Sequence, residues 1–228
     1  MATKFAIPSN GPEDWARVLG DPVKHWRTGY SARSAAYSWE TARGLPVEIA
    51  EALGPDVELL LAIPEHKVEM PGRGADSQCD VFALCRRSGE LMVVAVEAKV
   101  DESFGPTIGD WLAEGGQNRR DRIDRLVADL SSPADPTPDL RYQLFHRTAA
   151  AVYEARRFGA REAVMLVQSF SGAHRWREDF DAFVSYLGAA PDGPLSAYTL
   201  PDGLELRLGW VTSSFPIVPD EPAPAVGN

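Results

Sequence analysis

The sequence has no apolar run near the roughly 20 residues that span a bilayer. Its longest apolar run, residues 91–96, has the length of one strand. The first eight residues lack the apolar segment of a signal peptide. The sequence therefore predicts a cytoplasmic protein with no membrane partner. Its 228 residues suit one large domain, 1–228, with a substantial core.

Cysteine and lysine are scarce. Cys79 and Cys85 are the only cysteines, and on the strand expected there they lie about 20 Å apart at ~3.3 Å per residue. They cannot pair with each other, and without a nearby His they do not make a zinc site, so we expect buried thiols. Lysine occurs four times against nineteen arginines. A buried Lys99 in such a chain indicates a chemical reason for an ammonium group.

Basic charge is in deficit overall, with 23 Lys and Arg against 33 Asp and Glu and a net charge of −10. Nucleic-acid binding relies on Lys and Arg, so this total at first argues against such a partner. The distribution weakens the argument. Residues 117–161 hold nine Arg against six acids, a net charge of +3, and residues 178–228 hold eight acids and one Arg. We therefore expect one basic helical region and an acidic carboxyl-terminal part.

Apolar patterning predicts one α/β domain around a mixed sheet. We expect helices over residues 31–43, 47–53, 111–130, 138–158 and 176–187, and strands over 57–63, 78–85, 91–100 and 163–168. A hairpin over 195–211 follows, and residues 216–228, which are Pro-rich and acidic, are expected to be flexible. Pro138 at the first helical position and Gly159 after the last residue bound the 138–158 helix.

The hairpin of residues 78–100 carries the candidate chemistry. A two-residue turn at Ser88 and Gly89 makes the numbers of paired residues sum to 177. Asp80 then faces Glu97, with Cβ atoms about 4.5–5.5 Å apart. Lys99 lies on the same face, which is otherwise apolar.

Two facing carboxylates near the end of a buried hairpin repel each other and are costly to desolvate. A cation between them, a shared proton or a paired base would relieve this. A divalent cation such as Mg²⁺ prefers carboxylate oxygens and waters. Lys99 could then orient a metal-bound water or stabilise phosphate charge. The structural alternative is a buried ion pair of Lys99 with Asp80 or Glu97.

This arrangement resembles the PD-(D/E)XK nuclease superfamily. The family's motif is an acid that opens the second core strand, followed by (Asp or Glu)-X-Lys at the end of the third. Asp80 and Glu97-Ala98-Lys99 stand at these places, and Cys79 stands where the family name has Pro. The resemblance covers residues 31–170 and points to a bacterial branch. It implies a restriction-endonuclease-like αβββαβ core in a mixed sheet flanked by helices, with a C-terminal helix and β-hairpin added.

A second match to Asp/Glu-X-Lys is Glu65-His66-Lys67. It follows Pro64, lies in a polar stretch and has no acid in matching hairpin register. We therefore prefer Glu97-Ala98-Lys99 as the site.

The resemblance also implies supporting residues. Glu40, or alternatively Glu51, would be the helix acid that supports the metal. Gln143 would point toward the metal and the scissile phosphate, and Arg147, one turn later, would clamp a phosphate. A solvated surface position is an equally good interpretation of each acid. His146 neighbours this face of the 138–158 helix.

The implied activity is hydrolysis of phosphodiester bonds in nucleic acid, DNA in first place, dependent on Mg²⁺ or Mn²⁺. Asp80, Glu97 and the carbonyl of Ala98 would hold the metal, and Lys99 would position the water. Two alternatives stay open: a non-catalytic relative that keeps the fold as a binding or assembly module, and a hydrolase of small phosphorylated metabolites. The oligomeric state is left open, a homodimer included.

Overall fold

The computed structural model describes residue 6 and residues 9–20, 23, 26–27 and 29–215. The expected tail, 216–228, lies outside the described residues. The elements are η1 (Pro12–Val18), α2 (Ser31–Ala42), α3 (Val47–Leu53), β1 (Val57–Val68), β2 (Ser77–Arg87), β3 (Glu90–Lys99), α4 (Ile108–Ala113), α5 (Gln117–Asp129), α6 (Tyr142–Phe158), β4 (Glu162–Ser169), α7 (Arg177–Leu187), β5 (Ala190–Asp192), β6 (Leu195–Thr199) and β7 (Glu205–Thr212). Among the described residues, no helix has the length and apolar character needed to cross a membrane.

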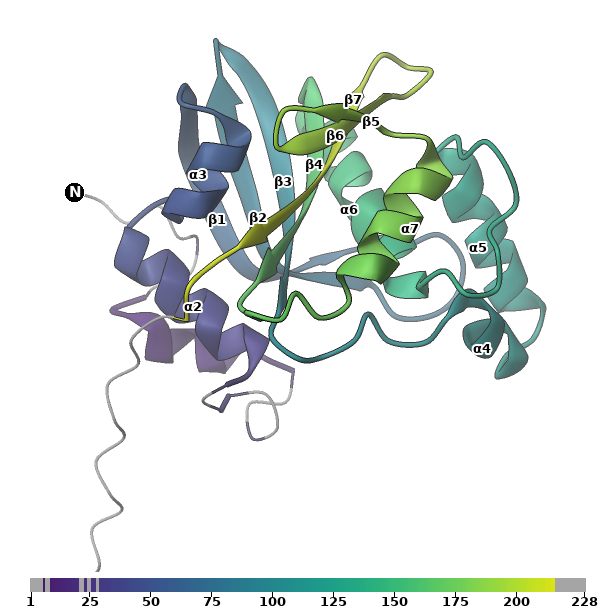
Figure 1. The fold of residues 1–228 in the computed structure, drawn as a ribbon, viewed down its shortest axis with the longest axis horizontal. Coiled ribbons are helices and arrows are strands. Elements are labelled where there is room, and N and C mark those ends of the chain that lie inside the picture. The colour runs from purple at the N-terminus through teal and green to yellow at the C-terminus, as the bar shows by residue number, and fades with distance from the viewer. Residues whose placement is uncertain (1–5, 7–8, 21–22, 24–25, 28, 216–228) are drawn as a thin grey trace, which may run out of the picture.

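A seven-stranded, mostly antiparallel sheet runs through the molecule in the order β1-β2-β3-β4-β7-β6-β5 (Figure 1). Strands β1, β2 and β3 form an antiparallel meander, and β4 lies parallel to β3 and to β7. A parallel neighbour needs a crossover connection, which α4, α5 and α6 provide between β3 and β4. The class predicted from the sequence, a mixed α/β sheet flanked by helices, is confirmed.

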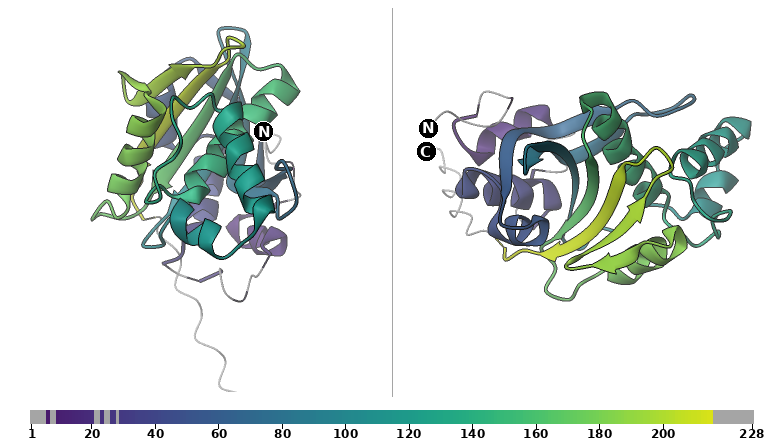
Figure 2. Two further views of the ribbon diagram at one scale, coloured as in Figure 1. Left: turned by 90° about the vertical axis from the view of Figure 1, so that its right-hand side faces the viewer. Right: turned by 90° about the horizontal axis from the view of Figure 1, so that it is seen from above.

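Helices cover both faces of the sheet, with η1, α2 and α3 on one face and α4 to α7 on the other (Figure 2). The core is divided accordingly, because alternate residues of a strand point to opposite faces. Phe82 and Ala95 belong to the core under α6, and Val81 and Val94 belong to the core under α2. The two-sided burial expected for the β2–β3 hairpin is thus confirmed.

Helix α6 starts at Tyr142, so the predicted start at Pro138 is wrong by four residues. The preceding backbone is engaged elsewhere. Arg141 is extended and forms a β-bridge with Thr107, and the carbonyl of Pro138 accepts a hydrogen bond from Gly109 N at 2.8 Å. These tertiary contacts with the α4 region outweigh the local helix-start signal. The predicted end before Gly159 is correct, and Gly159 adopts the left-handed conformation typical of a helix terminus.

Three further boundaries differ from the prediction. The helical stretch 111–130 is two helices, α4 and α5, separated at Gly115, where a side chain would collide with Arg119. Strand β1 continues to Val68, five residues beyond the predicted end, because it pairs with β2 over its whole length. The 3₁₀ helix η1 and the short strand β5 were not predicted.

Candidate functional site

The candidate site lies at the end of the β2–β3 hairpin, beside α6. The turn at Ser88 and Gly89 and the predicted register are confirmed, with paired residues from Arg87 and Glu90 to Val81 and Val96. Beyond Val96, the remaining residues of β3 alternate between the two cores, which places Glu97 and Lys99 on the face that α6 covers.

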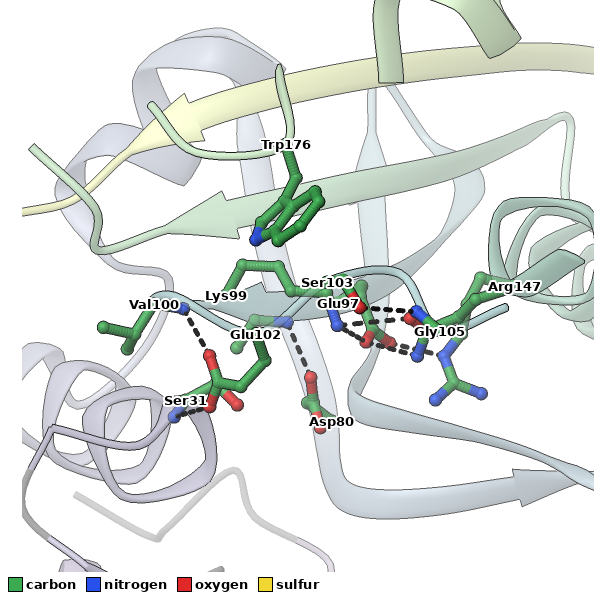
Figure 3. A network of polar contacts seen from close by, with 12 residues as sticks. Ser31, Asp80, Glu97, Lys99, Val100, Glu102, Ser103, Gly105, Arg147 and Trp176 are labelled. Atoms are coloured by element: carbon green, nitrogen blue, oxygen red, sulfur yellow. Dashed lines mark hydrogen bonds and ion pairs between the residues drawn. The ribbon is translucent and has the colours of Figure 1, made fainter. Parts of the chain in front are cut away.

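The Glu97 carboxylate stands at the centre of a charged cluster (Figure 3). Its Oε1 accepts hydrogen bonds from Lys99 Nζ at 2.6 Å and from Gln143 Nε2 at 2.7 Å. Its Oε2 pairs with Nε of Arg147. Gln143 Oε1 also lies 3.2 Å from Lys99 Nζ. The structure thus brings together four predicted site residues, and we call this group the Glu97 cluster.

Electrostatics keep the Glu97 carboxylate ionised. Glu97 and Lys99 are 3% and 5% exposed. Burial alone would raise the pKa of Glu97, but the charges of Arg147 and Lys99 and their hydrogen bonds lower it to about 2. Although burial opposes its charged form, the nearby Glu97 carboxylate raises the pKa of Arg147. The cluster is therefore a buried ion network with a permanent negative centre.

Asp80 borders this cluster, and among the described residues it forms no ion pair with a cation. The register places it across from Glu97, but its Oδ2 accepts a hydrogen bond from Ala98 N at 2.6 Å, just past the last paired residues of β2 and β3. Burial raises the pKa of Asp80 well above its usual range, and the negative charges of Glu97 and Glu65 raise it further. The predicted repulsion between Asp80 and Glu97 is thus present, because the negative charge of Glu97 disfavours the ionised form of Asp80 and raises its pKa.

Glu65 is the site residue that the sequence argument missed. Pro64 pairs with Val81 and His66 with Cys79, so Glu65 lies across from Asp80 on the other side of β2. The statement that its motif lacks an acid in matching register is therefore wrong. The motif Glu65-His66-Lys67 could have indicated this residue. Strand β1 continues past Pro64, so the motif pairs with β2 and Glu65 comes to lie across from Asp80.

The backbone at Glu65 is unusual for a strand, with a φ of 53°. A left-handed residue other than Gly costs of order 1–3 kcal/mol and is held in place only by its surroundings. Here the Gln78 Nε2 amide donates a hydrogen bond to Glu65 Oε2 at 2.6 Å. Burial raises the pKa of Glu65 to about 7, since the Gln78 hydrogen bond and nearby cations offset it only in part.

Two pockets flank Gln78 and Arg147, which line both of them. The first, of about 360 Å³, is lined by Glu65, Asp80 and the amino-terminal end of α2 around Ser31. We call it the acidic pocket.

The second pocket, of about 370 Å³, lies beside Lys99, Gln143 and His146. The Glu97 cluster therefore borders solvent-accessible space on two sides.

Glu102 fixes the amino terminus of α2 beside the acidic pocket (Figure 3). Its carboxylate accepts hydrogen bonds from Ser31 N at 3.1 Å and from Val100 N at 2.9 Å. Burial opposes the charged form, but these backbone donors lower the pKa of Glu102. Sequence patterns did not point to Glu102, because one of its two partners, Ser31, begins a helix 71 positions earlier in the chain.

Glu40 and Glu51 are not brought into the site. Glu40 Oε1 accepts a hydrogen bond from Trp15 Nε1 at 2.8 Å and pairs with the Ser9 hydroxyl, so it joins α2 to η1. Glu51 is exposed on α3, on the opposite face of the sheet from the Glu97 cluster. The role of Glu40 as a supporting helix acid therefore stays a prediction, and in the structure its carboxylate is engaged by Ser9 and Trp15.

His146 is held through Ser77. Arg147 Nη1 donates to the Ser77 hydroxyl at 2.9 Å, and that hydroxyl lies 2.9 Å from His146 Nδ1. Burial and the charge of Arg147 lower the pKa of His146 well below its usual range. A neutral ring that accepts at Nδ1 carries its proton on Nε2.

These residues lie within a recognised family. A family model described as "Domain of unknown function (DUF6946)" matches residues 8–215. The chain belongs to this family. No curated protein and no solved structure matches the chain. DUF6946 membership assigns no activity, so the argument for function depends on the chemistry of the site.

The acidic pocket of this DUF6946 member offers the type of ligand that a hard divalent cation prefers, namely carboxylate oxygens. Asp80 and Glu65 offer carboxylate oxygens at a pocket, and the pKa of each is raised by burial and by neighbouring acids, so negative charge there is poorly compensated. Mg²⁺ is commonly held by one or two carboxylates and several waters. Within the described residues, no three His, Cys, Asp or Glu side chains already stand in a geometry that could hold a metal ion. Water would therefore supply most of the ligands.

Proposed function

We propose that this protein is a metal-dependent nuclease that hydrolyses phosphodiester bonds of nucleic acid, DNA in first place, at a PD-(D/E)XK-type site. The observation that carries the proposal is that Asp80 lies beside the Glu97–Lys99 ion pair, with Asp80 lining one pocket and Lys99 lining the other. A purely structural ion pair has no need of an additional buried acid with a raised pKa beside it. An excess of carboxylates next to a lysine suits a divalent cation and a phosphate.

The topology supports the finer assignment of a restriction-endonuclease-like core. Helix α2, the antiparallel meander β1–β2–β3, the crossover through α6 and the parallel strand β4 follow the αβββαβ order. Asp80 lies near the start of β2, and Glu97 and Lys99 lie at the end of β3, which agrees with the positions that the motif would require. Helix α7 and the β6–β7 hairpin are additions at the carboxyl-terminal side.

Each residue has a definable task in this proposal. When bound, Mg²⁺ or Mn²⁺ would lower the pKa of a water and polarise the phosphoryl group, held by Asp80, Glu97 and the Ala98 carbonyl. Lys99 is oriented by Glu97 and Gln143, so its ammonium group can direct the attacking water or stabilise charge on the phosphate.

Arg147 and Glu65 complete the proposed site. Arg147 lines both pockets, and its guanidinium can hold a phosphate oxygen while it pairs with Glu97. Glu65 takes the supporting role first expected of Glu40, because it is the acid that faces Asp80.

A non-catalytic binding module is the second candidate, and one observation favours it. Both Glu97 oxygens are engaged by Lys99, Gln143 and Arg147, which leaves the cluster closed and charge-paired. In that case the cluster would serve the fold alone.

A cleavage assay tests the proposal. The purified protein is incubated with plasmid and oligonucleotide DNA and RNA in Mg²⁺, in Mn²⁺ and in EDTA, with a panel of phosphorylated metabolites in parallel. We expect polymer cleavage only with a divalent cation, and its loss in Asp80→Ala and in Lys99→Ala. Lys67→Ala is the matched control, because Lys67 belongs to the second motif but is exposed. Equal cleavage by all variants, or none by the parent protein, would contradict the proposal.

A further inference from the structure

A row of two adjoining pockets leads away from Lys99 toward α5. The pocket beside Lys99 shares Asp76, Tyr142 and His146 with a third pocket, of about 260 Å³. That third pocket is bounded by the 73–76 segment before β2 and by α4 and α5. We call the two together the basic groove.

The charge of the basic groove is opposite to that of the whole chain. Its lining cations are Lys99, Arg147, Arg73, Arg119 and Arg122, and its lining acid is Asp76. The chain as a whole carries a net charge of −10. Such an inversion in a concave surface focuses positive potential there.

The walls of the basic groove are built rigidly. The buried Arg122 donates hydrogen bonds to the carbonyls of Pro71 at 3.0 Å and Ala75 at 2.8 Å, which fastens the β1–β2 connection alongside α5 (Figure 1). Gly74, with a φ of 134°, lets this connection pass close to the guanidinium of Arg122. No acid is bonded to this guanidinium among the described residues, so its charge still acts on the groove.

The opposite wall is an aromatic stack. Trp111 and Tyr142 are stacked with ring centroids 3.7 Å apart, and the Arg119 guanidinium lies 5.2 Å from the Trp111 ring centroid. This holds Arg119 at the groove.

Arg73 is exposed at the basic groove, where its guanidinium is accessible to a ligand. Within the part of the chain that the structure describes, it has neither a hydrogen bond nor an ion pair. Arg119 is bonded to the Trp111 carbonyl and lies 3.3 Å from the exposed Glu114 carboxylate. An exposed pair of this kind contributes little and is easily exchanged for a phosphate.

We propose that the polymer enters as a single nucleic-acid strand that lies along the basic groove, with Arg73 and Arg119 on its phosphates. The inference deepens the proposed nuclease function and rests on it. The strand leads from α5 past His146 to Lys99, which places the scissile phosphate beside the Glu97 cluster. The two pockets, of about 260 and 370 Å³, have the size of small-ligand sites, which suits individual nucleotides of a flexible strand better than the body of a double helix.

Charge also favours a single strand over a duplex. A duplex carries one negative charge per ~1.7 Å and presents both strands to the protein. Outside the groove such a rod meets a chain with a large negative excess. A single strand bends into the groove and keeps its phosphates near the arginines.

Fluorescence anisotropy in EDTA tests the inference without cleavage. A labelled single-stranded oligonucleotide and its duplex are titrated with the wild-type protein and with Arg73→Ala and Arg119→Ala. We expect the single strand to bind more tightly than the duplex. Each substitution should weaken binding roughly three- to tenfold and lower the salt slope by about 0.7 per lost phosphate contact. Arg86→Ala, at the far end of β2 with Glu58 as its partner, is the matched control and should bind like wild type.

Tighter binding of the duplex, or equal losses in Arg73→Ala and Arg86→Ala, would overturn the inference. Arg73 makes no bond to the described residues, so its removal should leave the fold intact even where Arg119→Ala disturbs α4 and α5. The two proposals fail separately. Binding through Arg73 and Arg119 without any cleavage refutes the nuclease alone, and divalent-dependent cleavage with wild-type binding by both variants refutes the groove alone.

Discussion

Two buried polar networks lie on opposite faces of the sheet at the same level of the strands. On the α6 face, Glu97 is surrounded by Lys99, Gln143 and Arg147. On the α2 face, Gln168, which pairs with Ala98, accepts a hydrogen bond from Trp39 Nε1 at 3.1 Å and donates to the hydroxyls of Ser38 and Ser213, each at 3.1 Å. One network is charged and the other neutral.

The two networks differ in whether their polar groups are fully paired and in whether they reach a pocket. In the Gln168 network each donor meets an acceptor, and none of its members lines the pockets described above. The Glu97 network borders two pockets and adjoins Asp80 and Glu65, whose pKa values are raised by burial and by neighbouring acids, so a bound cation would relieve the repulsion between them. A neutral network in which the polar groups are paired serves to fix the packing of the fold. A charged network beside acids with strongly raised pKa values is more typical of a functional site.

The largest contrast is expected for activity. Lys99→Met removes the ammonium group and keeps a side chain of similar length, so divalent-dependent cleavage should fall by about 10²–10³-fold. Gln168→Met leaves the Trp39 N–H unpaired, which should cost about 1–3 kcal/mol of stability but leave cleavage per folded molecule unchanged. Cleavage rates and urea denaturation of both variants check this. Equal loss of activity in the two variants would contradict the assignment of function to the charged network alone.

The next contrast concerns stability. Arg147→Met leaves the buried Glu97 carboxylate without its strongest counter-charge, which should lower the free energy of unfolding by about 3–5 kcal/mol. Adding Glu97→Gln to Arg147→Met should recover part of the loss, because the carboxylate that lost Arg147 is no longer charged. The recovery is only partial, because the buried Lys99 ammonium then loses its carboxylate partner. Urea denaturation near neutral pH measures both. A cost for Arg147→Met no larger than that for Gln168→Met would show that the charged network is not strongly coupled.

Stability should respond to pH through the acids of the charged side. The folded-state pKa of Glu65 is raised from 4.5 to about 7, so its contribution is fully present below pH 4.5 and is lost as pH rises to about 7. Glu97 acts in the opposite sense, because its lowered pKa makes a contribution that is lost as pH falls from about 4.5 to about 2.

Glu65→Gln isolates the first of these effects. In EDTA the variant should match wild type at pH 5 and be more stable at pH 8, since it has no carboxylate to ionise. Mg²⁺ should stabilise wild type more at pH 8 than at pH 5, and the variant less. Thermal unfolding across this pH range gives the comparison, and parallel curves for the two proteins would contradict it.

The smallest contrast compares two peripheral members. Gln143→Leu removes one hydrogen bond to Glu97 and one from Lys99, so cleavage should fall roughly tenfold while stability changes little. Ser213→Ala removes one acceptor of Gln168 and should cost about 1 kcal/mol with no change in cleavage. Cleavage rates and urea denaturation of both variants test this prediction. Slower cleavage by Ser213→Ala would contradict it.

The central hairpin could be predicted from the sequence because its geometry is local. A two-residue turn fixes the register, and alternation then decides which side chains share the face of Glu97 and Lys99. The helical period placed Gln143 and Arg147 on one face of their helix, and the resemblance implied that this face points toward the site. These predictions depend on nearest-neighbour rules that tertiary contacts seldom override.

Glu65 and Glu40 show where such rules stop. Glu65 is aimed into the site by a left-handed backbone inside a strand, a conformation that its residue type does not announce. Glu40 had suitable helix spacing, but its carboxylate is taken by Trp15, whose 3₁₀ helix carried no clear sequence signal. The start of α6 was likewise decided by a bridge between residues 34 positions apart, Thr107 and Arg141.

The net charge of the chain is likewise a poor guide to the charge of a binding surface. The total of −10 describes the whole chain, whereas a ligand meets the surface that the fold assembles. Helices α5 and α6 bring their arginines to the basic groove, and Arg73 joins them from the β1–β2 connection. Segment sums anticipated the first contribution, but the contribution of Arg73 required the structure.

Calorimetric titration with Mn²⁺ near neutral pH tests the central claim most directly, because it asks whether the charged side of the sheet holds a divalent cation. We predict saturable binding to the wild-type protein and at least a tenfold loss in Asp80→Asn, or about 1.4 kcal/mol. Binding by Gln168→Met should equal that of wild type. Absence of Mn²⁺ binding by the wild-type protein, or equal affinity in Asp80→Asn, would contradict the account.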